Sequence, residues 1–102
     1  MDKDTLAPGP ALDAAVAAAL GWDEATIAAL VPVIHFSTRI EDAWRVVERL
    51  AADGWDIEIG YDAVDCSWVA SFMKGEKWGV STVKVGPHAI SLAALAALEG
   101  DK

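Results

Sequence analysis

The residues best suited to chemistry lie together at the start of one predicted helix. Ser37, Thr38 and Arg39 offer two hydroxyls, a guanidinium and the free backbone N–H groups of a helix start, a combination that binds phosphate or carboxylate. His35 and Phe36 come directly before them and carry rings that stack on a base. This stretch therefore predicts an anion site. An ordinary capped helix with a solvated arginine explains the same residues.

Four further residues are candidates for ligand contacts. His88 begins a second helix and forms a weaker version of the same arrangement. Trp78 and Lys84 share one face of a predicted strand with Thr82 and would form a pocket with a polar floor, although a solvated sheet face explains them equally well. Trp22 follows a helix stop. Like Trp78, it is a candidate for a ligand wall or a subunit contact, against simple peripheral packing.

No residue pattern in the chain is typical of catalysis or of metal binding. His35 and His88 lie far apart, and Cys66 stands alone in a strand pattern that predicts an inert core thiol. Ser37 and Thr38 beside His35 resemble a nucleophile and its base, but these residue types also cap helices. The eight glycines stand singly, so no phosphate loop is present. We expect no enzyme activity, no metal and no cofactor.

Composition narrows the class of partner. The 102 residues suit one domain, and the formal charge of −8 disfavours binding to nucleic acid polymers or anionic membranes. A single cysteine excludes a disulfide within the chain. No apolar run approaches the length of a membrane span, and no secretory signal is recognisable, which favours a cytoplasmic protein.

The elements that must position these residues follow from periodicity and from glycine stops. We expect a flexible N-terminal arm over 1–10 and one domain over 11–100. Thr38 and Glu41 have the spacing of a capping box, and Asp23 is typical of an N-cap. Trp44 falls on the apolar stripe of its helix and is assigned to the core. The predicted helices cover 11–20, 24–30, 38–53 and 88–98.

Three strand patterns lie between the last two helices, over 55–61, 66–74 and 78–85. Their alternation predicts one buried and one wet face, with Trp55 and Trp68 on buried positions. Short connections make neighbouring strands antiparallel. The chain is therefore expected to be an α+β protein in which helices pack on a three-stranded antiparallel β-meander. The last helix is apolar almost all round, which predicts burial between layers or a subunit contact.

The segment 35–44, His-Phe-Ser-Thr-Arg-Ile-Glu-Asp-Ala-Trp, resembles the phage ABA-sandwich domain family of small bacteriophage and prophage proteins. Members carry an aromatic-Ser-Thr-Asp-Ile-x-x-Ala-Trp stretch at the start of their main helix, and Arg39 here replaces the usual acid. The pair Gly21-Trp22 and the run Pro87-His88-Ala89-Ile90 are similar to other parts of the family. The resemblance implies an α-β-α layered sandwich and a phage origin. It implies no reaction.

Two functions are consistent with these features. The first is a non-enzymatic phage protein that binds a small, anionic, nucleotide-like signal of host defence and withholds it, in the host cytoplasm. The alternative is an acidic module that docks on a host or phage protein. The apolar last helix and the surplus tryptophans also predict a homo-oligomer, most simply a two-fold dimer.

Overall fold

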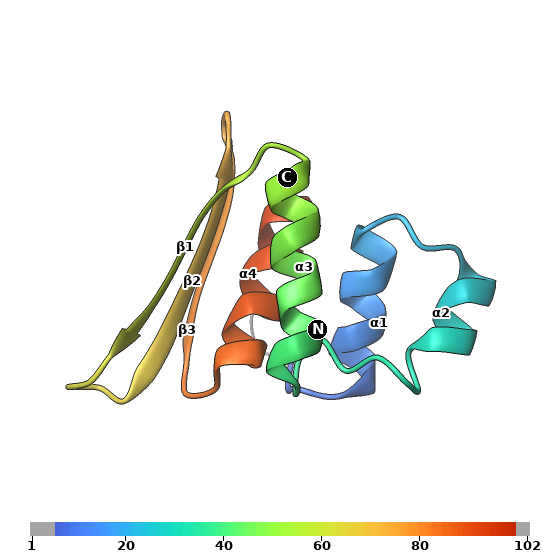
Figure 1. Ribbon diagram of the computed structural model, residues 1–102, viewed down its shortest axis with the longest axis horizontal. Coiled ribbons are helices and arrows are strands. Elements are labelled where there is room, and N and C mark those ends of the chain that lie inside the picture. The colour runs from blue at the N-terminus through green and yellow to red at the C-terminus, as the bar shows by residue number, and fades with distance from the viewer. Residues whose placement is uncertain (1–5, 100–102) are drawn as a thin grey trace.

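The computed structural model describes residues 6–99 and has four helices and one sheet (Figure 1). The predicted α+β class and the three-stranded meander packed with helices are confirmed. Each predicted element is present, with ends shifted by a few residues at most. In chain order they are α1 (Pro10–Ala19), α2 (Glu24–Leu30), α3 (Ile40–Ala52), β1 (Asp56–Asp62), β2 (Ser67–Lys74), β3 (Lys77–Val83) and α4 (Gly86–Glu99).

The strands pair antiparallel in the order β1-β2-β3. The register sets Ile57 opposite Phe72, and Phe72 opposite Gly79, so these three lie in one row on one face of the sheet. The next row, with Met73 opposite Trp78, points to the other face. This alternation decides which side chains enter the core and which are left on the open side.

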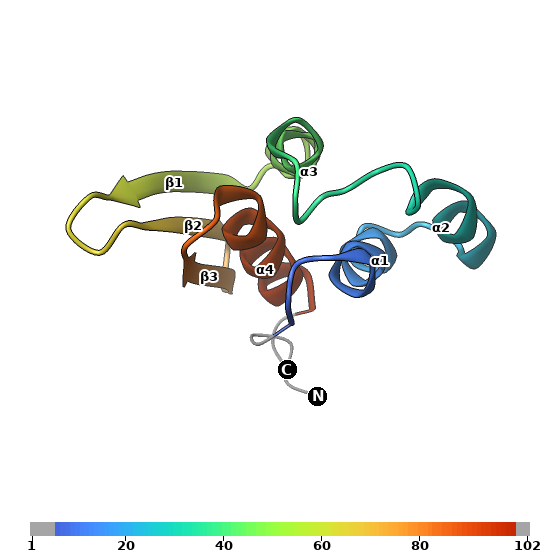
Figure 2. The same ribbon diagram turned by 90° about the horizontal axis from the view of Figure 1, so that it is seen from below.

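All four helices lie on one side of the sheet, as Figures 1 and 2 both show. Helix α4 packs directly on β2 and β3, and α1 and α3 pack in turn on α4. Helix α2 is outermost and contacts α1. The predicted burial of α4 is confirmed, since its residues from Ala89 to Leu95 are almost inaccessible to solvent. Within residues 6–99, no helix covers the opposite face of the sheet.

Glycine at position 79 allows this close packing. A Cβ there would overlap the carbonyl oxygen of Ala93 and the backbone nitrogen of Ala97, and would lie 2.9 Å from the Ala97 Cα. These are backbone atoms of α4, which cannot move aside as a flexible side chain can. The sheet and its main helix therefore touch backbone to backbone, with only alanine methyls beside the contact.

Helix α2 begins as predicted. The Asp23 carboxylate accepts the backbone N–H of Thr26 at 2.7 Å, which makes Asp23 the N-cap. This hydrogen bond lowers the pKa of Asp23 from its ordinary 3.8. The cap is thus strongest above that ordinary pKa and is lost as the pH falls through the lower pKa of the folded state.

The prediction that Trp44 belongs to the core is wrong, because 47% of the residue is exposed. The buried stripe of α3 consists of Ala43, Val46, Val47 and Leu50, and Trp44 stands beside it. Asp42 is also buried on this side of α3, and its carboxylate accepts the backbone N–H of His35 at 2.8 Å.

Two of the three residues that the strand patterns assign to the core are not buried. Cys66 is exposed and has a φ of 54°, because it closes the β1–β2 turn rather than beginning β2. Trp68 is partly exposed at the edge of the helix-facing side, where it packs against Tyr61 at a ring separation of 5.0 Å. Trp55 is buried as predicted.

The contact at Gly79 gives the first testable prediction. Gly79→Ala should destabilise the protein by about 3 kcal/mol or more, because the added methyl forces α4 away from β3. Urea unfolding followed by circular dichroism measures the change in free energy. Gly60→Ala is the control, since its Cβ would lie 3.6 Å from Val69 Cγ1, an ordinary contact, and should change stability by less than about 1 kcal/mol. Equal stability of the two variants would contradict the close packing.

Candidate functional site

The predicted anion site at residues 35–39 is not assembled as the sequence predicts. Phe36 and Ser37 are buried, His35 is partly buried, and Thr38 and Arg39 are exposed. The N-cap of α3 is Arg39, and no side chain caps it. The predicted capping box of Thr38 and Glu41 is therefore wrong.

Ser37 instead joins α1 to the segment before α3. Its hydroxyl donates to the Asp13 Oδ1 at 2.6 Å, and its backbone N–H donates to the same oxygen at 2.8 Å. The Ser37 Oγ also accepts the backbone N–H of Gly9 at 2.8 Å. Asp13 and Ser37 are both inaccessible to solvent. This serine is occupied by the fold and is not available to a ligand.

Two other predicted site residues also make contacts within the fold. His88 is partly buried, and its Nε2 lies 2.8 Å from the carbonyl oxygen of Leu6. Within the predicted arm, Leu6 and Gly9 are thus bonded to the domain, while residues 1–5 lie outside the described residues. Trp22 packs edge-on against Phe36, with ring centroids 5.7 Å apart. The two rings border a small cleft of about 160 Å³ that Arg45 and Arg49 also line.

Trp78 and Thr82 lie on the uncovered side of the sheet, as their alternation predicts, whereas Lys84 follows the end of β3. Trp78 is 63% exposed. The Lys84 Nζ donates to the carbonyl oxygen of Asp65 at 2.6 Å, across the end of the sheet. Trp78 does not meet the candidates at the start of α3, because it points to the uncovered face and α3 lies on the other side of the sheet (Figure 1).

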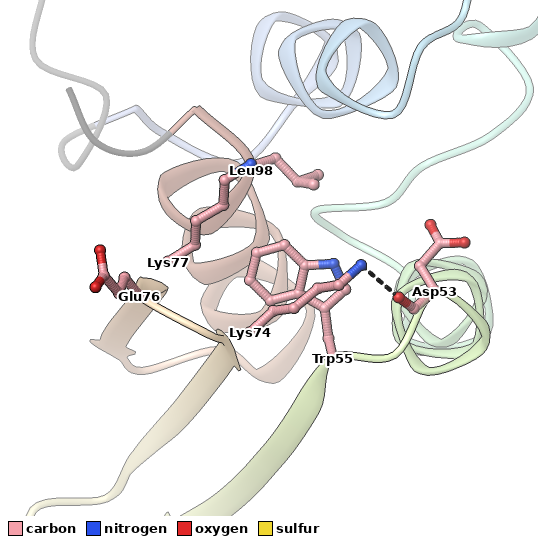
Figure 3. Close-up of a pocket in the computed structure, with 6 residues that line it drawn as sticks. All are labelled: Asp53, Trp55, Lys74, Glu76, Lys77 and Leu98. Carbon is pink, nitrogen blue, oxygen red and sulfur yellow. Dashed lines mark hydrogen bonds between the residues drawn. The ribbon is translucent and has the colours of Figure 1, made fainter.

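A cavity lies at the other end of the sheet, where α3, the β2–β3 turn and α4 meet (Figure 3). Its volume is about 660 Å³. The side chains around it combine a buried indole with two lysines and two acids. The lining residues are Asp53, Trp55, Lys74, Glu76, Lys77 and Leu98.

Two turns position the residues that line this cavity. The chain leaves α3 through Gly54, whose φ of 94° reverses direction and sets Asp53 and Trp55 on the rim. The β2–β3 turn makes Lys74 and Lys77 a directly opposed pair, so both amines belong to one end of the sheet. The Lys74 Nζ donates to the carbonyl oxygen of Asp53 at 2.6 Å (Figure 3).

The acids near the cavity do not neutralise both lysines. The Asp53 carboxylate is held by Arg49, with Oδ2 3.1 Å from the guanidinium Nε. Lys74 is bonded to a carbonyl and so keeps its charge unpaired. In the part of the chain that the structure describes, no ion pair or hydrogen bond holds the Lys77 amine or the Glu76 carboxylate. The lining of the cavity therefore holds two amines without a carboxylate partner and one carboxylate without a cation.

Other kinds of site find no support in this part of the molecule. Among residues 6–99, no three or more His, Cys, Asp or Glu residues come together as metal ligands. No helix in this range combines the length and apolarity that crossing a membrane requires.

Comparison with known proteins identifies the family. The model of the phage ABA sandwich domain matches residues 16–95, from the middle of α1 to α4. The chain belongs to the phage ABA sandwich domain family. The comparisons with curated proteins and with solved structures found no match. The family resemblance predicted from residues 35–44 is confirmed, and Ser37 of that stretch joins α1 to the segment before α3.

The cavity residues Trp55, Lys74 and Lys77 were not among the predicted site residues. One signal for them exists in the sequence: a two-residue turn, Gly75-Glu76, makes the flanking lysines cross-strand neighbours. The end of α3, which supplies Asp53 and Trp55, joins them only through tertiary packing. Periodicity carries no information about that approach.

The Ser37 network gives the second prediction. Ser37→Ala should cost about 2–3 kcal/mol of unfolding free energy, because it removes the bond between hydroxyl and carboxylate and leaves the Gly9 N–H unpaired in a partly buried site. Thr38→Ala, at the adjacent exposed residue, should change stability by less than about 0.5 kcal/mol. Urea unfolding of both variants provides the measurement. A larger loss of unfolding free energy for Thr38→Ala than for Ser37→Ala would support the capping box instead.

Proposed function

We propose that this protein is a non-enzymatic binding protein that captures a small anionic ligand in the cavity between Lys74 and Lys77. The observation that carries the proposal is the pairing of two amines beside one indole in a cavity of about 660 Å³. This volume lies within the range of roughly 300–1,000 Å³ that is typical of small-molecule pockets. The cavity offers binding groups but no nucleophile with a base, which favours capture over reaction.

The chemistry of the lining favours a nucleotide-like ligand. Lys74 and Lys77 are compact cations that suit phosphate oxygens. Trp55 lines the cavity and is 8% exposed, so it offers the ligand an apolar wall beside the two amines.

The charge of the whole protein opposes an anionic ligand, and the local charge offsets this at close range. The chain carries a formal −8, but exposed charges beyond about 8–10 Å are largely screened at physiological salt. A ligand in the cavity lies beside two amines and one unpaired acid. Binding should therefore depend on these lysines more than on the net charge.

The family suggests the setting. A phage domain of this size that binds a nucleotide-like signal of host immunity would keep that signal from its receptor in the host cytoplasm. Such a protein acts as an anti-defence sponge and needs no catalytic residue. This setting rests on association with phage and not on the cavity itself.

The third prediction concerns this ligand. A thermal-shift screen of the purified protein against cyclic oligonucleotides, cyclic ADP-ribose isomers and common nucleotides should yield a hit. A ligand at a hundred times its dissociation constant adds about 2.7 kcal/mol of stability, which raises the melting temperature by several degrees. For the ligand found, Lys77→Ala should weaken binding about tenfold or more, because one charged hydrogen bond to phosphate is lost.

Arg39→Ala is the matched control. It removes one exposed cation from the helix start that the sequence predicted as the anion site, and it should leave ligand binding unchanged. The reverse pattern, with binding lost on Arg39→Ala and kept on Lys77→Ala, would move the site to the start of α3. A screen without any shift on a well-folded protein would refute capture of these compounds.

A protein-docking module is the second candidate function, and the uncovered face of the sheet favours it. Met73 and Trp78 lie side by side on that face, with Val80 one row further along. Val80 and Met73 are each 49% exposed. Exposed aromatic and methionine side chains in one patch are typical of protein contacts.

The fourth prediction separates the two functions with two adjacent residues. Lys77 lines the cavity, while Trp78 points to the uncovered face of the same strand. If the ligand site is correct, Lys77→Ala should reduce the thermal shift to about half or less, because a tenfold weaker ligand adds only about 1.4 kcal/mol at the same concentration, and Trp78→Ala should retain the full shift. If the protein docks through its sheet, Trp78→Ala should instead abolish capture of a host protein in a pull-down, and Lys77→Ala should not.

A further inference from the structure

The sheet has two free edges, and they differ in chemistry. In the order β1-β2-β3, the outer backbone groups of β1 and β3 have no strand partner among residues 6–99. β1 carries Asp56, Glu58 and Asp62, and such charges protect an edge against pairing. β3 has no charged residue between Lys77 and its end, no proline, and valine at its centre. It is the unprotected edge.

We propose that two copies of this protein pair through β3, antiparallel and about a two-fold axis at Val80. Val80 is the middle residue of the seven in Lys77–Val83, so only this register pairs the strand over its whole length. Trp78 then lies opposite Thr82 of the partner subunit, on the uncovered face of a continuous six-stranded sheet. The apolar patch of each copy is extended by that of its partner.

Charge complementarity selects the same register. With the axis at Val80, Lys84, which follows β3, lies opposite Glu76 of the partner subunit, and the symmetry repeats this pair at the other end. The Lys84 Nζ donates to the carbonyl oxygen of Asp65, a neutral partner, so its charge has no counterion within the described chain. Glu76 has no ion pair in the described part of the chain. A register shifted by two residues places Lys84 opposite either Lys74 or Trp78 of the partner subunit. Pairing β1 with its own copy about Ile59, by contrast, would place Asp56 opposite Asp62 of the partner subunit.

The helical layer leaves room for this pairing. Helix α4 packs on the helix-facing side of β2 and β3, and no strand pairs with the outer backbone groups of β3 among residues 6–99. Figure 2 shows β3 at the border of the sheet, with no described helix or strand beyond it. In this arrangement the edge of the sheet, and not the buried α4, forms the central contact of the predicted dimer.

The proposed pairing would also change the charge at the cavity. Glu76 is the one lining acid without a cation, and Lys84 of the partner subunit would neutralise it. Lys74 and Lys77 would then face a ligand with no unpaired acid beside them. This consequence rests on the proposed function, whereas the dimer itself does not.

Sedimentation equilibrium without any ligand tests the dimer over a wide range of protein concentration. The wild type should fit a monomer–dimer equilibrium. Lys84→Glu and Glu76→Lys should each raise the dissociation constant about tenfold, because each creates two like-charge pairs. The double variant, with both charges exchanged, should return the constant towards the wild-type value.

A second pair of variants tests the position of the axis. Val80→Lys places two lysines opposite each other at the axis and should give monomer, with the melting curve confirming that the chain is folded. Val64→Lys makes the same change in the β1–β2 turn and should leave the dimer intact. The proposal would be overturned if the wild type stays monomeric or if its mass grows beyond the dimer. It would equally be overturned if Val80→Lys leaves the dimer intact, or if the single charge variants dimerise as tightly as the wild type. Ligand binding is measured separately, so its absence leaves this result unaffected.

Discussion

Helix α4 lies so close to β3 that position 79 has no space for a side chain, and the rest of the architecture depends on this contact. It explains why α4 is rich in alanine: Ala93 and Ala97 let the backbones approach, while Ile90, Leu92 and Leu95 are buried among the surrounding elements. Because α4 is in turn the surface on which α1 and α3 pack, the contact also fixes the distance of every helix from the sheet. A chain with little aromatic content in its helical layer gains its packing density in this way.

A polar interaction completes the helical layer. The Asp13 carboxylate receives both the hydroxyl and the backbone N–H of Ser37, which fixes the segment before α3 against α1. The cost of burying a carboxylate is reduced only by such hydrogen bonds, so the pair is specific to this geometry. The serine that best matched a ligand site in the sequence is therefore a structural residue, and the same holds for the buried Phe36 beside it.

Sequence patterns predicted the elements well because alternation, helical spacing and glycine stops are local. They failed where a local pattern allows two answers. Trp44 and Val46 both lie within one turn of the apolar stripe, and only packing against α4 decided which is buried. The cavity was missed for a related reason: Lys74 and Lys77 are neighbours by turn geometry, but Asp53 and Trp55 reach them through the fold.

The one-sided helical layer gives β3 two separate roles. Odd-numbered residues of β3 point to α4, and at the turn this side opens into the cavity where Lys77 lies. Even-numbered residues point to the uncovered face, where Trp78 and Val80 gather. Because the two sets alternate along one strand, any movement of β3 relative to α4 changes both surfaces together. Pairing at the β3 edge would hold the strand in place. A contact on the uncovered face would then be coupled to the distance between the two lysines in the cavity.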